Sequence, residues 1–325
     1  MDKPKKFYKG PANVVYNIDD SACGTDEAVV EAIQGSIRNK LQQGTLQIPR
    51  LPQVAGRIMQ LTQSGDDIDL AEASSVIRTD PALAARILGT ANSAAFAGTG
   101  RVNAIDTAMM RLGIKSVCNI VFTESLQNKL FSSKNYRDLV EQSWCLSMGC
   151  AVACETLSAA TGLEPESAFL IGLLHDTGTP TLISAVSEYE RKNNGQALGL
   201  AIVEILNSQL HEEVGAHVLE KWAMPEALVQ AAGAHHRYRS GPEATPSRQL
   251  IYAAGLLCTQ LGIGTEQRDV TFNLERVFSD IGLTDSSQLE SILESIDTDV
   301  RALFTEFGIK PPPPRPNLDE GRPAA

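Results

Sequence analysis

The sequence predicts an all-α protein, and its composition and periodicity both support this fold class. Hydrophobic residues make up 43% of the 325 residues and aromatic residues only 5%, while Ala and Leu are abundant. Strands favour β-branched and aromatic side chains, whereas Ala and Leu are strong helix formers. Apolar residues recur three and four positions apart along most of the chain, as in helices that bury one face. Because no segment alternates convincingly like a strand, we expect helices packed on helices.

The first half of the chain reads as short helices with clear start and stop signals. The first predicted helix spans residues 26–41. Asp80 followed by Pro81 predicts a helix start, because Asp caps free amides and Pro tolerates the first helical position. Asn92 predicts a helix end where the side chain bonds to the backbone, and Gly113 predicts another with a left-handed C-cap. Alternatively, Asp80 and Asn92 line a groove between two lobes.

The second half predicts further helices of the same kind. They span residues 144–160, 166–176, 199–207, 212–222, 225–236, 248–261 and 285–307. The last of these begins with Asp285 and Gln288 at the spacing of a capping box. From Pro311 the chain is Pro-rich, which predicts a disordered or polyproline-like tail. Binding of this tail to an SH3-like domain is the alternative.

The charge of the chain argues against two classes of partner. There are 39 acidic and 28 basic residues, which gives a net charge of −11 and a pI near 5.0. Nucleic acids and anionic membranes repel such a chain, and the only basic cluster is a short Lys-rich segment within residues 3–9. The N-terminal segment lacks a signal-peptide core, and no apolar run is long enough to span a bilayer. We therefore expect a cytoplasmic protein that contacts neither nucleic acid nor membrane.

The six cysteines show no CxxC pair and no spacing typical of a disulfide scaffold. Cys150 and Cys154 lie four residues apart on a predicted helix, so a redox pair or half of a metal site is one interpretation. The other is that they are small buried apolar side chains in a reducing compartment, and the spacing favours this one.

All five histidines lie between residues 175 and 236. His175 is followed by Asp176 at the end of an apolar helix, which puts a nitrogen and a carboxylate side by side where the helix opens. Such a pair suits a hard divalent ion such as Mn²⁺, Fe²⁺ or Mg²⁺. His211 begins one predicted helix and His235-His236 end another, so three helices can converge on one site. Hydrogen-bonded core histidines or a pH-sensitive cluster are the alternatives, and His217 is expected at the surface or in helix packing.

Several ordered motifs carry a resemblance to a known family. They are RTDPALAARILGTANSAAF from Arg78, AIDTAMMRLGIKSVCNIV from Ala104, ESAFLIGLLHDTG from Glu166 and LHEEVGAHVLEKWAMPEALVQAAGAHH from Leu210. Together these motifs resemble the HDOD family, a relative of the HD and HD-GYP phosphohydrolases, over residues 48–239. The resemblance implies a two-lobed helical domain in bacterial signal transduction.

The periodicity, the composition and the resemblance together predict four segments. Residues 1–25 form a flexible N-terminal arm, and residues 26–240 form the HDOD domain, whose first lobe ends at about residue 135. Residues 241–310 form C-terminal helices packed on the HD-like second lobe. Residues 311–325 form the disordered Pro-rich tail.

The resemblance also implies candidate site residues. His175 and Asp176 match the HD pair of the catalytic relatives. His211 and one or both of His235 and His236 match the further histidines of the two-metal versions. These five residues therefore form the candidate pocket, or the remnant of a metal site.

Three positions depart from the catalytic pattern. Leu146 stands where a ligand His is expected, Gly255 or a neighbour stands where a ligand Asp is expected, and Thr179 stands where HD-GYP proteins have a lysine. A hydrolytic site needs a metal that binds, activates water and clamps a phosphoryl oxygen. Loss of a His and an Asp removes a neutral donor and a negative charge, so an intact two-metal clamp is not expected.

The sequence thus predicts a non-catalytic regulatory module with a degenerate HD site. It would act by sensing a ligand or by binding signalling proteins, with no required cofactor and at most a weakly bound divalent metal (Mn, Fe or Mg). A nucleotide second messenger such as cyclic di-GMP is a candidate ligand. One alternative is a metal-dependent phosphohydrolase or phosphodiesterase with an incomplete or rearranged site. Another is a scaffold that recruits partners through residues 289–307 or the tail.

Overall fold

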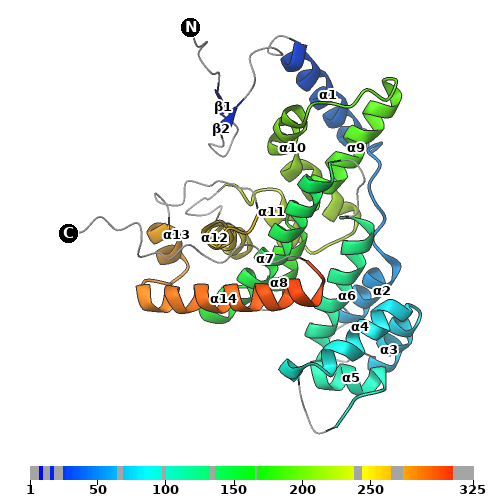
Figure 1. Cartoon of the computed structure of the whole chain (residues 1–325), viewed down its shortest axis with the longest axis vertical. Helices are drawn as coiled ribbons and strands as arrows, with labels where there is room; N and C mark the ends of the chain where they lie inside the picture. The colour runs from blue at the N-terminus through cyan, green and yellow to red at the C-terminus, as the bar shows by residue number, and fades with distance from the viewer. Residues whose placement is uncertain are drawn as a thin grey trace, which may run out of the picture. The chain divides into compact units, whose positions relative to one another are not determined.

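The computed structural model describes residues 7–9, 15–17, 25–63, 69–96, 100–131, 136–164, 167–237, 244–264 and 274–309 (Figure 1). This part of the chain is almost entirely helical, which confirms the all-α fold class. Two strands, β1 (Phe7–Lys9) and β2 (Val15–Asn17), pair antiparallel, so the prediction of no strand was wrong at this point. Strands of three residues are too short to show an alternating pattern. No helix in the described ranges is both long and apolar enough to cross a bilayer.

The chain divides into two compact units, residues 49–132 and residues 1–48 with 133–325. The division places helix α1 (Thr25–Gln42) with the second unit, where it contacts α9 (Gly178–Lys192) and α10 (Leu200–Lys221). The sequence predicts residues 26–41 as part of the first lobe, and the structure differs there. The reason is a buried apolar stripe on α1, formed by Val30, Ile33, Ile37 and Leu41.

The unit of residues 49–132 consists of short helices joined by capped turns. They are α2 (Gln53–Gln63), α3 (Leu70–Arg78), α4 (Pro81–Ala91), the 3-10 helix η1 (Ala94–Phe96), α5 (Ile105–Leu112) and α6 (Ile114–Lys129). Asp80 caps α4 as predicted, since its carboxylate accepts hydrogen bonds from the amides of Ala82 and Leu83. Asn92 bonds to the backbone as predicted, donating to the carbonyls of Leu88 and Val102.

The second unit is built around the long helix α7 (Arg137–Thr161), which contacts α8, α9, α12 and α14 (Figure 1). The other helices, besides α1, α9 and α10, are α8 (Ala168–Leu174), α11 (Glu226–Ala232), α12 (Pro246–Gln260), α13 (Leu274–Asp280) and α14 (Ser286–Glu306). Asp285 caps α14, accepting from the amide of Ser287. The predicted tail of residues 311–325 lies outside the described residues.

Two glycines allow the helices of this unit to approach backbone to backbone. A Cβ atom at Gly172 would lie 2.2 Å from the carbonyl oxygen of Cys150, so α8 packs directly on α7. A Cβ atom at Gly178 would lie 1.9 Å from the carbonyl oxygen of His211, so the start of α9 packs directly on α10. Both distances exclude any larger residue without movement of the backbone. The second contact places the start of α9 beside the middle of α10.

Candidate metal centre

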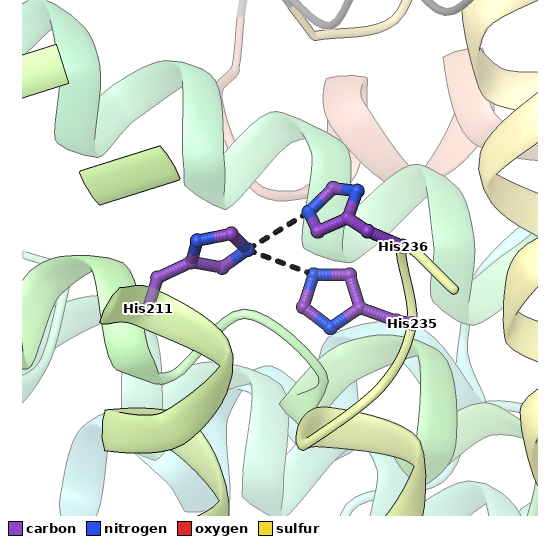
Figure 2. A group of neighbouring side chains, drawn as sticks. All are labelled: His211, His235 and His236. Atoms are coloured by element: carbon purple, nitrogen blue, oxygen red, sulfur yellow. Dashed lines mark hydrogen bonds between the residues drawn. The ribbon is translucent and has the colours of Figure 1, made fainter. Parts of the chain in front are cut away.

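Three imidazole rings converge in the second unit (Figure 2). The Nε2 atom of His211 lies 3.1 Å from Nε2 of His235 and 2.8 Å from Nε2 of His236. Each residue offers one nitrogen to the group, and these nitrogens lie within 4.8 Å of one another. His211 and His235 are buried, and His236 is partly exposed. The three residues form the histidine cluster, which has the geometry of a metal site.

The cluster is assembled from the middle of one helix and the turn after another. His211 lies in the middle of α10, which runs unbroken, so the prediction that a helix begins at His211 was wrong. His235 and His236 follow the end of α11 at Ala232, whereas the predicted helix runs through both. This turn allows two consecutive side chains to face the same point, which a helix would separate by about 100°.

The two remaining predicted residues lie at the end of α8. The rings of His175 and His235 meet edge to face with centroids 4.8 Å apart, so His175 adjoins the histidine cluster. Asp176 is buried and both its carboxylate oxygens accept hydrogen bonds from hydroxyl groups. Ser143 donates to one oxygen and Thr179 to the other, each at 2.6 Å. Asp176 is therefore held by α7 and α9.

Backbone carbonyls fix the orientation of three rings. Nδ1 of His175 lies 2.6 Å from the carbonyl oxygen of Gly172, and Nδ1 of His211 lies 2.6 Å from that of Asn207. Nδ1 of His235 lies 2.9 Å from the carbonyl oxygen of Ala232. Because a carbonyl oxygen only accepts, each of these Nδ1 atoms carries the proton that it donates. In the neutral rings the lone pair is then on Nε2, the arrangement found in metal-ligating histidines.

This tautomer leaves an excess of lone pairs inside the cluster. With Nδ1 protonated, the Nε2 atoms of His211 and His235 are both acceptors, yet they lie only 3.1 Å apart. A proton donated by His236 to His211 satisfies one of these contacts and leaves the other repulsive. The cluster is balanced when a positive charge, from a metal ion or a protonated ring, lies among the three nitrogens.

The chemistry of the donor set decides which ion fits. Three imidazoles suit Zn²⁺, Cu²⁺, Fe²⁺ or Ni²⁺, whereas Mg²⁺ and Ca²⁺ prefer oxygen ligands. The cluster therefore fits the Fe²⁺ of the sequence-based expectation better than Mg²⁺. A bound ion of this class supplies a Lewis acid with an open coordination position. His211, His235 and His236 would hold it.

The two positions assigned to lost ligands are both buried. Leu146 is buried and packs beside Gly264, where a Cβ atom at position 264 would lie 3.2 Å from the Leu146 side chain. Gly255 is buried within α12, and its carbonyl accepts a hydrogen bond from the Thr259 hydroxyl at 2.9 Å. On α7 it is Ser143, one turn before Leu146, that contacts Asp176. The only signal for Ser143 in the sequence is this one-turn offset from Leu146.

Sequence reasoning also missed Glu212. Its carboxylate accepts a hydrogen bond from the backbone amide of His236 at 2.9 Å. It also forms an ion pair with Nε of Arg237 at 3.3 Å. The signal available was its position directly after His211, at the side of the same helix.

His217 and the cysteines of the described residues are not part of the histidine cluster. Nδ1 of His217 is 3.6 Å from a carboxylate oxygen of Glu220, one turn later on α10. The sulfur atom of Cys150 lies 3.8 Å from that of Cys258 on α12, and both residues are buried. Burial raises the pKa of the Cys154 thiol well above its usual value, which disfavours the reactive thiolate. These features support the interpretation of Cys150 and Cys154 as buried packing residues.

Comparisons with known proteins agree with this architecture. The HDOD domain model matches residues 48–238. An uncharacterized protein of Treponema pallidum (strain Nichols) is 24% identical over 208 residues, which is 60% of this chain. The chain spans only 39% of the length of that protein.

Two solved structures share the fold. The first is an HDOD domain protein of unknown function from Geobacter sulfurreducens, with 22% identity and a TM-score of 0.63 over 84% of this chain and 97% of that one. The second is a candidate metal-dependent phosphohydrolase from Shewanella amazonensis SB2B, with 20% identity and a TM-score of 0.62 over 84% and 99%.

A third structure is that of a candidate signal transduction protein from Marinobacter aquaeolei VT8. It has 22% identity and a TM-score of 0.64 over 86% of this chain and 66% of that one. All three likenesses establish the fold, and the family match covers more than half of the sequence. The chain belongs to the HDOD family.

Proposed function

We propose that this chain is a non-catalytic bacterial signalling module. Its histidine cluster binds an ion or small ligand, and partner proteins recognise the liganded form. The observation that carries the proposal is the arrangement around Asp176. Both of its oxygens accept hydrogen bonds from the hydroxyls of Ser143 and Thr179. Within the described residues, the metal-competent group contains three histidines and no carboxylate.

Hydrolysis by paired metals requires more than this donor set. The two ions of such a site lie about 3.5–4 Å apart and clamp the attacking and leaving oxygens together. Negatively charged ligands offset the charge of two divalent ions, and neutral imidazoles do not. Asp176 is the acidic residue that the family resemblance assigns to this task, and here two hydroxyl groups bind it. Ligand binding without turnover is what the remaining groups support.

The nature of the partners follows from charge and family. An acidic chain favours proteins or small ligands over nucleic acid. The similar Marinobacter structure belongs to a candidate signal transduction protein, which supports a regulatory role. The bacterial cytoplasm is the proposed location. Signalling proteins are therefore the proposed partners, and a nucleotide second messenger is the proposed organic ligand.

The experiment is a thermal-shift screen of nucleotides and divalent ions with the purified full-length chain. A ligand that binds the folded state alone raises the melting temperature by an amount that grows with its concentration relative to Kd. We expect a ligand whose stabilisation is lost in His211→Ala and kept in His217→Ala, since His217 lies on the same helix outside the cluster. A ligand that stabilises both variants equally would place the sensing site elsewhere.

A phosphohydrolase is the alternative function, and the convergence of the three Nε2 atoms is the observation that favours it. Its test is phosphodiesterase turnover of a nitrophenyl phosphodiester in Mn²⁺, Fe²⁺ or Zn²⁺, together with elemental analysis of the protein. We expect no turnover above the metal alone. Turnover that His175→Ala or Asp176→Ala abolishes, and His217→Ala retains, would contradict the non-catalytic proposal.

A further inference from the structure

We propose that Glu212 is a positioning residue that sets the affinity of the histidine cluster for a transition-metal ion. The inference rests on the proposed role of the cluster as a binding site and extends it to a residue outside the cluster. Glu212 holds the backbone that carries two of the three ligands, and its charge lies behind one of the rings.

The first step is mechanical. His235 and His236 follow the end of α11 and have no helix of their own to fix them. The Glu212 carboxylate accepts the backbone N–H of His236 at 2.9 Å, which ties this turn to α10. Since His211 is the residue before Glu212, the same turn of α10 supplies one ligand and fixes the backbone of the others. A site held in its binding geometry loses less conformational entropy on binding an ion.

A second contact anchors the carboxylate itself. Its other oxygen accepts from Nε of Arg237 at 3.3 Å, and Arg237 also donates to the carbonyl oxygen of Gly233 at 2.6 Å. The two oxygens of Glu212 therefore contact the backbone of His236 and the side chain of Arg237. The Glu212 side chain is only 19% exposed, compared with 56% for Arg237, so the contact to the His236 amide is shielded from water.

The third step is electrostatic. A carboxylate oxygen of Glu212 lies 4.0 Å from Nδ1 of His235, the nitrogen opposite the one that faces the cluster. A negative charge behind a ligating ring makes its Nε2 a better donor and offsets the charge of a bound cation. Nδ1 of His235 donates its hydrogen bond to the carbonyl oxygen of Ala232. Glu212 therefore acts on this ring through the electric field of its charge.

The next residue supplies a matched control. Glu213 is also a glutamate on α10, but it pairs with Arg38 at 3.2 Å and its side chain is 49% exposed. Its carboxylate has no contact with the cluster among the interactions of the described residues. Glu213→Gln thus removes the same charge from the same helix without touching the turn that carries His235 and His236.

The experiment compares the full-length chain with Glu212→Gln, Glu212→Ala and Glu213→Gln. Binding of Zn²⁺ is measured by calorimetry, and binding of Co²⁺ by its visible ligand-field absorption. Residues that orient a metal-ligating histidine typically contribute 10- to 100-fold to metal affinity. We expect Glu212→Ala to weaken binding by about 10- to 100-fold, and Glu212→Gln, which keeps an acceptor oxygen, by about tenfold. Glu213→Gln is expected to stay within about twofold of the parent, as exposed ion pairs contribute little.

The melting temperature of the metal-free variants separates positioning from stability. Weaker binding by Glu212→Gln at an unchanged melting temperature, with altered Co²⁺ absorption, supports the inference. If Glu212→Ala fails to fold, Glu212→Gln decides the matter alone. Equal affinities in Glu212→Gln and the parent, or equal losses in Glu212→Gln and Glu213→Gln, would overturn it. Absence of Zn²⁺ and Co²⁺ binding by the parent also overturns it, but leaves the proposal of a non-metal ligand for the module in place.

Discussion

Gly178 lies directly against the carbonyl group of His211, so that a single methyl group at position 178 would lie 1.9 Å from that oxygen. Both are backbone atoms of packed helices, so either one can move away only if its helix moves with it. This contact therefore fixes the position of α10 relative to the start of α9, and with it the position of the His211 ring. Gly178, two residues after Asp176, therefore has a structural role in this chain, whether or not a metal binds.

The first prediction is that Gly178→Ala destabilises the fold and perturbs the histidine cluster. Overpacking of a tight interior typically costs about 1–3 kcal/mol, and here the clash is with backbone. Urea unfolding followed by circular dichroism measures the change in the free energy of unfolding. Gly35→Ala is the control, since a Cβ atom there meets nothing within 4 Å and Ala favours the helix. Equal stability of the parent and Gly178→Ala would show that α9 can shift away from α10 freely.

The second prediction concerns the hydroxyl that holds Asp176. Ser143→Ala removes a hydrogen bond of 2.6 Å to a buried carboxylate, which we expect to lower the free energy of unfolding by about 1.5–3 kcal/mol. Ser147 is the matched control on the same helix, because it is also buried and its hydroxyl has no hydrogen-bond partner in the described structure. Ser147→Ala should be neutral or slightly stabilising. Urea unfolding of both variants checks the pair, and a larger loss in Ser147→Ala would contradict the proposed role of Ser143.

The helices were predictable where periodicity and capping agreed. Asp80 and Asp285 each cap the helix that the sequence predicts after them, because capping depends on neighbours within three residues. The break predicted between residues 207 and 212 was wrong for the opposite reason. The polar stretch there interrupts the apolar pattern, yet α10 continues through it to carry His211. Packing against neighbouring helices overrode the local signal.

Of the candidate site, the sequence predicted mainly the histidines, which are an uncommon residue type in this chain. Histidines are scarce in this chain, so their confinement to one segment is enough to predict a cluster. Ser143 and Glu212 belong to common residue types, and their roles depend on contacts 33 and 24 positions away in sequence. Such contacts are set by the rotation of α7 and α10 about their axes. The resemblance to catalytic relatives indicated Leu146, one turn away from the residue that contacts Asp176.

The third prediction concerns the partly buried thiols. Burial raises the pKa of Cys118 and of Cys145 to about 11. At pH 8 only about one in a thousand of these thiols is ionised, so alkylation by iodoacetamide is expected to be slow until urea unfolds the chain. Mass spectrometry of peptides after timed labelling gives the rates. Labelling of native protein as fast as that of unfolded protein at pH 8 would contradict the burial effect.

The raised pKa of the Cys118 and Cys145 thiols also makes the free energy of unfolding depend on pH. Because the folded chain binds these protons more tightly than the unfolded chain, their contribution to stability is complete below the unfolded pKa and is lost as pH rises towards 11. The double variant Cys118→Ala, Cys145→Ala should therefore lose less stability than the parent between pH 8 and pH 11. Parallel stability curves for the two proteins over this range would contradict the expectation.

The last prediction distinguishes the ions that the cluster accepts. With three imidazole nitrogens and no carboxylate, the described site should bind Zn²⁺, Ni²⁺ or Co²⁺ and should not bind Mg²⁺. An ion present at 100 times its Kd stabilises the folded state by about 2.7 kcal/mol, which a thermal melt resolves easily. The stabilisation by Zn²⁺ should vanish in His235→Ala, which removes one of the three ligands, and persist in His217→Ala. Stabilisation by Mg²⁺ that His235→Ala abolishes would instead require an oxygen ligand in the site, and Asp176 would then have to exchange its two hydroxyl partners for the metal.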